Sequence, residues 1–90
     1  MSLIPGDIIA TRFNFGPCCA SHDICYGTCG SEKRSCDAAF GACLLAKCDR
    51  APPIVREICT AFALTFYAAV VELGDGAFCD AQSEACVCLR

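Results

Sequence analysis

Cysteine content constrains this chain more than any other feature, because eleven of its 90 residues are cysteine. That share exceeds the roughly 8–10% at which a short chain is typical of a disulfide scaffold, and disulfides rarely persist in a reducing cytosol. A chain of this length also builds one hydrophobic core rather than two. We therefore expect a single domain, residues 1–90, that is stapled by disulfides and secreted or periplasmic.

The cysteine count is odd, so at least one thiol has no partner within the chain. The opening sequence, MSLIPGDIIATR, has neither the basic start nor the apolar run of roughly 7–15 residues that marks a secretory signal. We therefore expect that a signal segment was removed. An upstream segment or a second chain is then expected to supply the missing cysteine partner.

The charge pattern limits the kinds of molecule that this chain can be expected to bind. Seven basic residues stand against ten acidic ones, for a net charge of −3, and only Lys33 and Arg34 are adjacent bases. This argues against a nucleic-acid surface and against strong attraction to anionic lipid, but leaves neutral or zwitterionic surfaces open. The longest charge-free stretch is 14 residues, 58–71, which is shorter than the ~20 needed to cross a bilayer and predicts a core helix.

Turn-forming residues divide the first half of the chain. An irregular arm, residues 1–17, holds two prolines and two glycines and precedes a helix over residues 18–29. Gly30 is expected to end that helix, and Ser31 to cap a second helix over residues 32–49.

A third helix is predicted over residues 54–73, apolar at nearly every position and therefore buried on most sides. Its Tyr67 is expected to fill the core. A turn at 74–76 leads to a short helix or loop in which three cysteines fasten the C-terminus: Cys79, Cys86 and Cys88. The pattern predicts an all-α fold, a small disulfide-stapled domain with antiparallel core helices.

The first predicted helix places the only histidine of the chain among cysteines. Cys18, His22, Cys25 and Cys29 recur at steps of four, three and four, which puts them on one side of the helix. Asp23 lies about 100° round from that side. A second acid, in the more buried half of the next helix, borders an apolar face and needs a partner there.

Three interpretations of this cluster remain open. In the first, His22 is merely packed and hydrogen-bonded. In the second, Cys18 or Cys19 joins His22 and Cys25 as zinc ligands, which the spacing permits and the oxidising context disfavours.

The third interpretation is hydrolysis. An antiparallel hairpin can bring Asp37 back alongside His22, with Cys25 and Cys36 well placed to bridge the two helices. A carboxylate bonded to one imidazole nitrogen fixes the tautomer and leaves the other nitrogen free to take a proton from water. Asp23 is then free to bind a hard cation such as calcium.

The string CCASHDICYGTCG resembles the active-site helix of the secreted phospholipases A2, whose signature is a cysteine pair, two residues and then His-Asp-x-Cys-Tyr. The wider string FNFGPCCASHDICYGTCGSEKRSCDAAF is more similar to the small bacterial and fungal branch of that superfamily. The resemblance implies hydrolysis of the sn-2 ester of glycerophospholipids with calcium as cofactor, at a phospholipid membrane or micelle surface.

Carried over by position, the resemblance makes His22 the general base, Asp37 the carboxylate that supports it, and Asp23 the calcium ligand. It gives Tyr26 a supporting place and makes Cys25 and Cys36 the best candidates for a disulfide pair. The enzyme is expected to be secreted.

One departure from the family pattern concerns calcium. The family has a glycine-rich calcium loop before this helix, with a cysteine that bridges to the position of Cys19. Residues 1–17 contain neither the loop nor a cysteine, so we expect that the calcium loop is absent from this chain and that calcium binds weakly. Cys19 is then the expected unpaired thiol, through which a separate N-terminal chain or segment can be bridged.

Two alternatives follow for the function. The chain is either an active phospholipase A2 or a catalytically silent binding or toxin-like relative with impaired calcium binding. Apolar side chains of the arm can line an acyl channel or simply pack in the core: Leu3, Ile4, Ile8, Ile9, Phe13 and Phe15.

Overall fold

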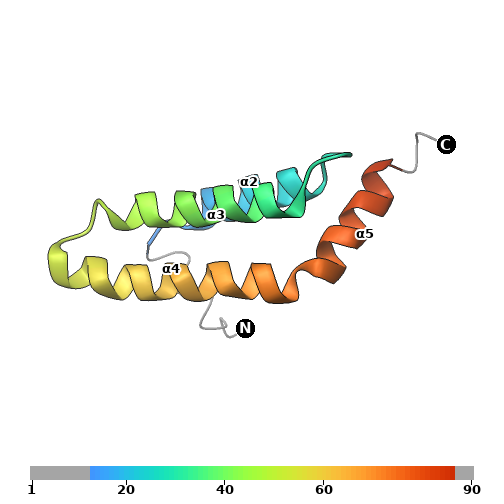
Figure 1. Cartoon of the computed structure of the whole chain (residues 1–90). Coiled ribbons are helices and arrows are strands. Elements are labelled where there is room, and N and C mark those ends of the chain that lie inside the picture. The colour runs from blue at the N-terminus through green and yellow to red at the C-terminus, as the bar shows by residue number, and fades with distance from the viewer. Residues whose placement is uncertain (1–12, 87–90) are drawn as a thin grey trace, which may run out of the picture.

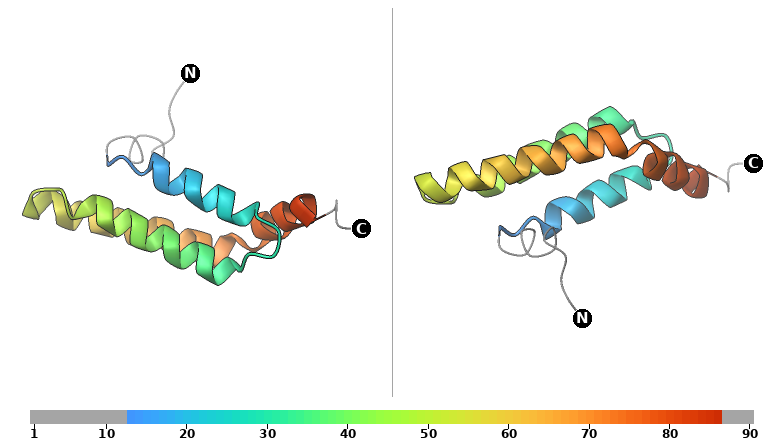
Figure 2. Two further views of the ribbon diagram at one scale, coloured as in Figure 1. Left: turned by 90° about the horizontal axis from the view of Figure 1, so that it is seen from above. Right: turned by 90° about the horizontal axis from the view of Figure 1, so that it is seen from below.

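The computed structural model describes residues 13–86 of the chain, and within them it contains four α-helices and no strand. The helices are α2 (Gly16–Tyr26), α3 (Lys33–Cys48), α4 (Pro53–Leu73) and α5 (Asp75–Cys86). Helices α3 and α4 lie antiparallel along most of their length, and α5 turns away from the end of α4 (Figure 1). Helix α2 lies to one side of this pair (Figure 2). The predicted all-α fold is confirmed.

Phe15, just before α2, is fully buried and lies at the centre of the core. Its ring meets Phe66 of α4 edge-on at 5.8 Å, and Phe13 packs against Phe62 with ring centroids 6.3 Å apart. The two arm phenylalanines thus pack in the core, while the other four apolar arm residues lie outside the described residues. The buried cluster joins three helices: Phe15, Cys18, Phe40, Leu44, Cys48, Cys59 and Ala63.

Disulfides tie α2 to α3, α3 to α4, and α5 to the turn after α2. The bonds in the described residues are Cys18–Cys43, Cys25–Cys36, Cys29–Cys86 and Cys48–Cys59. The proposed Cys25–Cys36 pair is confirmed, and Cys86 does fasten the C-terminal helix. The same prediction for Cys79 is wrong, because Cys79 and Cys19 are exposed free thiols. Cys88 lies outside the described residues.

Helix α2 is shifted toward the N-terminus relative to the prediction. It begins at Gly16, inside the predicted arm, because Pro17 suits the first helical turn, where its missing N–H is not needed. It ends at Tyr26 rather than at residue 29. Gly30 does not cap it but lies in the following turn with φ at +88°, a backbone conformation that favours glycine.

The other caps also differ from the prediction. The Ser31 hydroxyl donates to the Cys25 carbonyl at 2.5 Å instead of capping α3, whose N-cap is Glu32. Only Gly74 separates α4 from α5, so most of the predicted turn at 74–76 is helical.

The prediction that the third helix is buried on most sides is wrong. Only Cys59 and Ala63 of α4 are buried, whereas Ile54 and Leu73 are 77% and 81% exposed. Among residues 13–86, α4 packs mainly on α3 and the end of α5, so only one face of the helix has a partner layer. By length and composition, α4 is long and apolar enough to cross a membrane. The core helix of a soluble protein can share these two properties, and here the Cys48–Cys59 bond holds α4 against α3.

Candidate active site

The crossing of α2 and α3 brings the predicted histidine and aspartate together. His22 and Asp37 are 8% and 3% exposed, and His22 Nε2 lies 2.8 Å from Asp37 Oδ1. The Cys25–Cys36 disulfide joins the same two helices one residue from Asp37 and three from His22. The predicted contact between the imidazole and the carboxylate is therefore confirmed.

Two further donors satisfy the Asp37 carboxylate. The Tyr26 hydroxyl donates to Oδ1 at 2.6 Å, and Lys33 Nζ donates to Oδ2 at 2.7 Å. Burial alone would raise the pKa of Asp37, but the hydrogen bonds from His22, Lys33 and Tyr26 outweigh it and hold that pKa below its usual value. Burial, with the hydrogen bond to Asp37 and its charge, raises the pKa of Tyr26 to about 12.

These shifts determine the histidine tautomer. An ionised carboxylate is an acceptor only, so His22 Nε2 must carry the proton that it donates to Asp37. In neutral His22 the other nitrogen, Nδ1, then holds a free lone pair. The ring is also held in place between two aromatic side chains, with centroid distances of 4.1 Å to Tyr26 and 4.6 Å to Phe40.

Solvent reaches the free nitrogen. Nδ1 makes no hydrogen bond with the described residues, yet none of their buried side-chain nitrogen or oxygen atoms lacks a partner. Nδ1 must therefore touch solvent. A cavity of about 50 Å³ lies beside the ring, with Ser21, Ala39 and Phe40 in its wall. A water needs on the order of 10–15 Å³, so this cavity admits water but is too small for an acyl chain.

Asp23 points away from this pair. Its side chain is exposed and makes no hydrogen bond or ion pair with the described residues. Burial of the Cys19 thiol raises its pKa, and the negative charge of the neighbouring Asp23 raises it further. An outward carboxylate of this kind is a suitable single ligand for a hard cation.

The acidic, histidine and cysteine side chains of the described residues do not gather into a metal-binding group. No group of three or more histidine, cysteine or acidic side chains among them can hold a metal ion. The zinc interpretation is wrong, because Cys18 and Cys25 are in disulfides and His22 Nε2 faces Asp37. Calcium prefers about six to eight oxygen ligands, so a single exposed carboxylate such as that of Asp23 would not hold it alone.

Two residues of the site region were missed by the sequence reasoning. Lys33 stands four residues before Asp37, a spacing at which helical side chains meet, so its contact could have been found from the sequence. The contact of Gln82 in α5 could not have been found in this way, because Gln82 lies over 50 residues along the chain from its partner Tyr26. Its amide donates to the carbonyls of Tyr26 and Thr28, both at 2.8 Å, and so ties α5 to the turn after α2.

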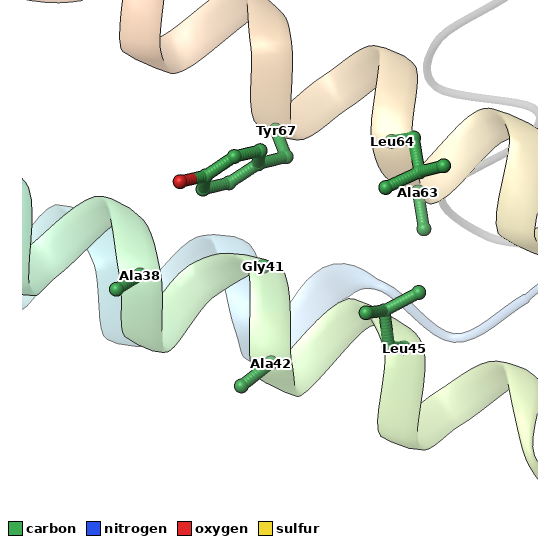
Figure 3. A pocket seen from close by; sticks show the side chains of 7 residues that line it. All are labelled: Ala38, Gly41, Ala42, Leu45, Ala63, Leu64 and Tyr67. Atoms are coloured by element: carbon green, nitrogen blue, oxygen red, sulfur yellow. The ribbon is translucent and has the colours of Figure 1, made fainter.

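An apolar groove of about 310 Å³ runs between α3 and α4, on the face away from α2 (Figure 3). Tyr67 is half-buried there rather than in the core as predicted, because Gly41 leaves room for its ring. A Cβ atom at Gly41 would lie 2.8 Å from that ring. The remaining walls come from small and aliphatic side chains: Ala38, Ala42, Leu45, Ala63 and Leu64.

The His22–Asp37 pair and the outward Asp23 are arranged as the resemblance to the secreted phospholipases A2 implies. The family whose model matches residues 9–90 is described as Group XII secretory phospholipase A2 precursor (PLA2G12), and this chain belongs to it. The resemblance to the secreted phospholipases A2 is thereby confirmed, and the match falls in group XII.

Individual relatives agree with the family. A Group XIIB secretory phospholipase A2-like protein of Mus musculus is 38% identical over 77 residues. A Group XIIA secretory phospholipase A2 of Homo sapiens is 33% identical over 76 residues. Each comparison covers 79% of this chain and 40% of the relative, so the chain spans less than half the length of these proteins. No solved structure matches the chain.

Proposed function

We propose that this chain carries the catalytic pair of a secreted phospholipase A2 that hydrolyses the sn-2 ester of glycerophospholipids. The family supports the enzyme class. The observation that carries the proposal is the 2.8 Å contact of His22 Nε2 with Asp37, which leaves Nδ1 open to solvent. A scaffold held only by disulfides needs no such arrangement.

The geometry supports a direct mechanism. His22 Nδ1 takes a proton from a water molecule, whose oxygen attacks the sn-2 carbonyl carbon. Asp37 stabilises the resulting imidazolium through the Nε2–H hydrogen bond and is not itself protonated. As the tetrahedral intermediate collapses, Nδ1–H returns the proton to the departing glycerol oxygen, which leaves a fatty acid and a lysophospholipid.

Calcium is the proposed cofactor, and it rests on the resemblance of the motif to the family. Asp23 would hold it, and a bound cation would stabilise negative charge on the carbonyl oxygen. No group of three or more acidic, histidine or cysteine side chains forms around Asp23 among the described residues, so backbone carbonyls, other parts of the protein or water would supply the remaining oxygens.

A phospholipid membrane or micelle is the proposed partner. Exposed apolar side chains on α4 and the apolar groove between α3 and α4 offer contact area for lipid chains. The exposed thiol of Cys19 also offers a point at which a separate N-terminal chain or segment can be bridged.

Phosphatidylcholine vesicles with different acyl chains at sn-1 and sn-2 test the proposal. We expect release of the sn-2 fatty acid alone, and loss of that release when a calcium chelator is added. Release from both positions, or turnover that the chelator leaves unchanged, contradicts the proposal.

The alternative is a catalytically silent phospholipase A2-like binding module. The small cavity beside His22 favours it. Calcium binding, or binding to vesicles, without release of fatty acid would support this alternative.

A further inference from the structure

Lys33 approaches the Asp37 carboxylate from the side opposite His22. Its ammonium donates to Asp37 Oδ2 at 2.7 Å, to the Val70 carbonyl at 2.8 Å and to the Val71 carbonyl at 3.1 Å. An ammonium group has three N–H donors, so these contacts use all of them. Its side chain is 18% exposed, and the Asp75 carboxylate lies 3.5 Å away.

The two carbonyls that Lys33 binds belong to the end of α4. The Val70 carbonyl also accepts the Gly74 N–H at 3.0 Å, and the negative end of the helix dipole at this terminus attracts a cation. The neighbouring backbone is closely packed, because a Cβ atom at Gly74 would lie 2.8 Å from the Tyr26 hydroxyl. One ammonium thus joins the first turn of α3, the last turn of α4 and the buried carboxylate.

The other donors to Asp37 cannot replace this contact. His22 and Tyr26 both bind Oδ1, so Lys33 is the partner of Oδ2 among the described residues. Without it, Oδ2 is buried with no donor, and the carboxylate is free to rotate away from the imidazole. A buried acceptor left without its partner costs free energy, which favours such a rearrangement.

We propose that Lys33 is a positioning residue of the candidate active site. It fixes the plane of the Asp37 carboxylate, so that Oδ1 faces His22 and Tyr26, and it holds the end of α4 against that carboxylate. This inference rests on the proposed roles of His22 and Asp37.

The test compares Lys33→Met with Lys33→Arg and with a control, Lys47→Met. Lys47 lies at the other end of α3 and makes no hydrogen bond or ion pair with the described residues. The single histidine of the chain gives one set of ring ¹⁵N signals, which report its tautomer at one fixed pH. Initial rates on phosphatidylcholine vesicles give kcat and KM for the same proteins.

We expect the parent protein and Lys47→Met to hold the Nε2–H tautomer, and Lys33→Met to show a mixture of both tautomers. Lys33→Met is expected to lower kcat by about 10-fold, a part of what general base catalysis contributes, and to leave KM within about twofold. Arginine restores the ion pair with Asp37, so Lys33→Arg is expected to recover the tautomer and most of kcat.

A folded Lys33→Met protein that keeps the Nε2–H tautomer and the parent kcat overturns the inference. Should Lys33→Met fail to fold, Lys33→Gln, which keeps a neutral donor, is measured by the same two readouts. If the parent protein shows no turnover, but Lys33→Met still changes the His22 tautomer, the result contradicts the proposed function and not the positioning role. An active parent whose tautomer is indifferent to Lys33 contradicts the positioning role alone.

Discussion

Removal of the Tyr26 hydroxyl tests whether the hydrogen bonds to Asp37 stabilise the fold. Tyr26→Phe deletes one oxygen from a side chain that is 5% exposed, and it breaks the 2.6 Å bond to Asp37 Oδ1. Hydrogen bonds to charged groups contribute about 1.5–3 kcal/mol. Asp37 keeps its bonds to His22 and Lys33, so we expect a loss of about 2 kcal/mol in the free energy of unfolding at about pH 7.

The loss must depend on pH, because Tyr26 donates to an ionised carboxylate. The pKa of Asp37 is lowered in the folded state, so its contribution to stability is present above the unfolded pKa and is lost as pH falls through the folded pKa. The difference between Tyr26→Phe and the parent should therefore be full at about pH 7 and shrink as the pH falls below the ordinary aspartate pKa of about 3.9.

Urea unfolding of both proteins, at about pH 7 and at a pH below the ordinary aspartate pKa, measures this difference in stability. Tyr67→Phe is the matched control, because the Tyr67 hydroxyl makes no hydrogen bond with the described residues. We expect the control to change stability by less than about 0.5 kcal/mol. An equal loss for Tyr26→Phe at both pH values would refute the reasoning, because it would mean that packing, and not the carboxylate, explains the effect.

Three further predictions concern the Cys19 thiol, the proposed calcium ligand Asp23 and the Cys29–Cys86 disulfide. Cys19 should react slowly with iodoacetamide near neutral pH, and faster as the pH rises toward its raised pKa, as mass spectrometry of the alkylated peptide can show. Asp23→Asn should weaken calcium binding at least about 10-fold in calorimetry without lowering the thermal midpoint, because Asp23 is exposed and unpaired. Replacing Cys29 and Cys86 together by serine should cost about 2–5 kcal/mol in urea unfolding, since their bond closes a separation of 57 residues. Fast alkylation of Cys19 near neutral pH would contradict the first prediction. Unchanged calcium affinity of Asp23→Asn would contradict the second, and unchanged stability of the protein without Cys29 and Cys86 would contradict the third.

The contact at the centre of the site could be predicted because it depends on local spacing. His22 and Cys25 share a helix face, a short turn follows, and an antiparallel return places Asp37 and Cys36 beside them. Helix bounds were less accurate near glycines, since Gly30 was expected to cap a helix and instead lies in a turn.

Burial could not be predicted in the same way. The composition of α4 shows that its residues are apolar, but whether a second layer covers them depends on the packing of the other helices. Gln82 was missed because no local rule relates it to the turn after α2. The helical spacing allows a contact between Lys33 and Asp37, but a lysine at this spacing can equally direct its ammonium to solvent, and only the packing of α4 decides between the two.

The most direct test of the account replaces the base while keeping its hydrogen bond. His22→Gln retains an amide that can donate to Asp37 but has no nitrogen able to take a proton from water. Fatty-acid release from phosphatidylcholine vesicles should fall by at least about 100-fold in a variant that unfolds at the parent temperature. A folded His22→Gln protein that releases fatty acid at the parent rate would contradict the claim that His22 activates the water.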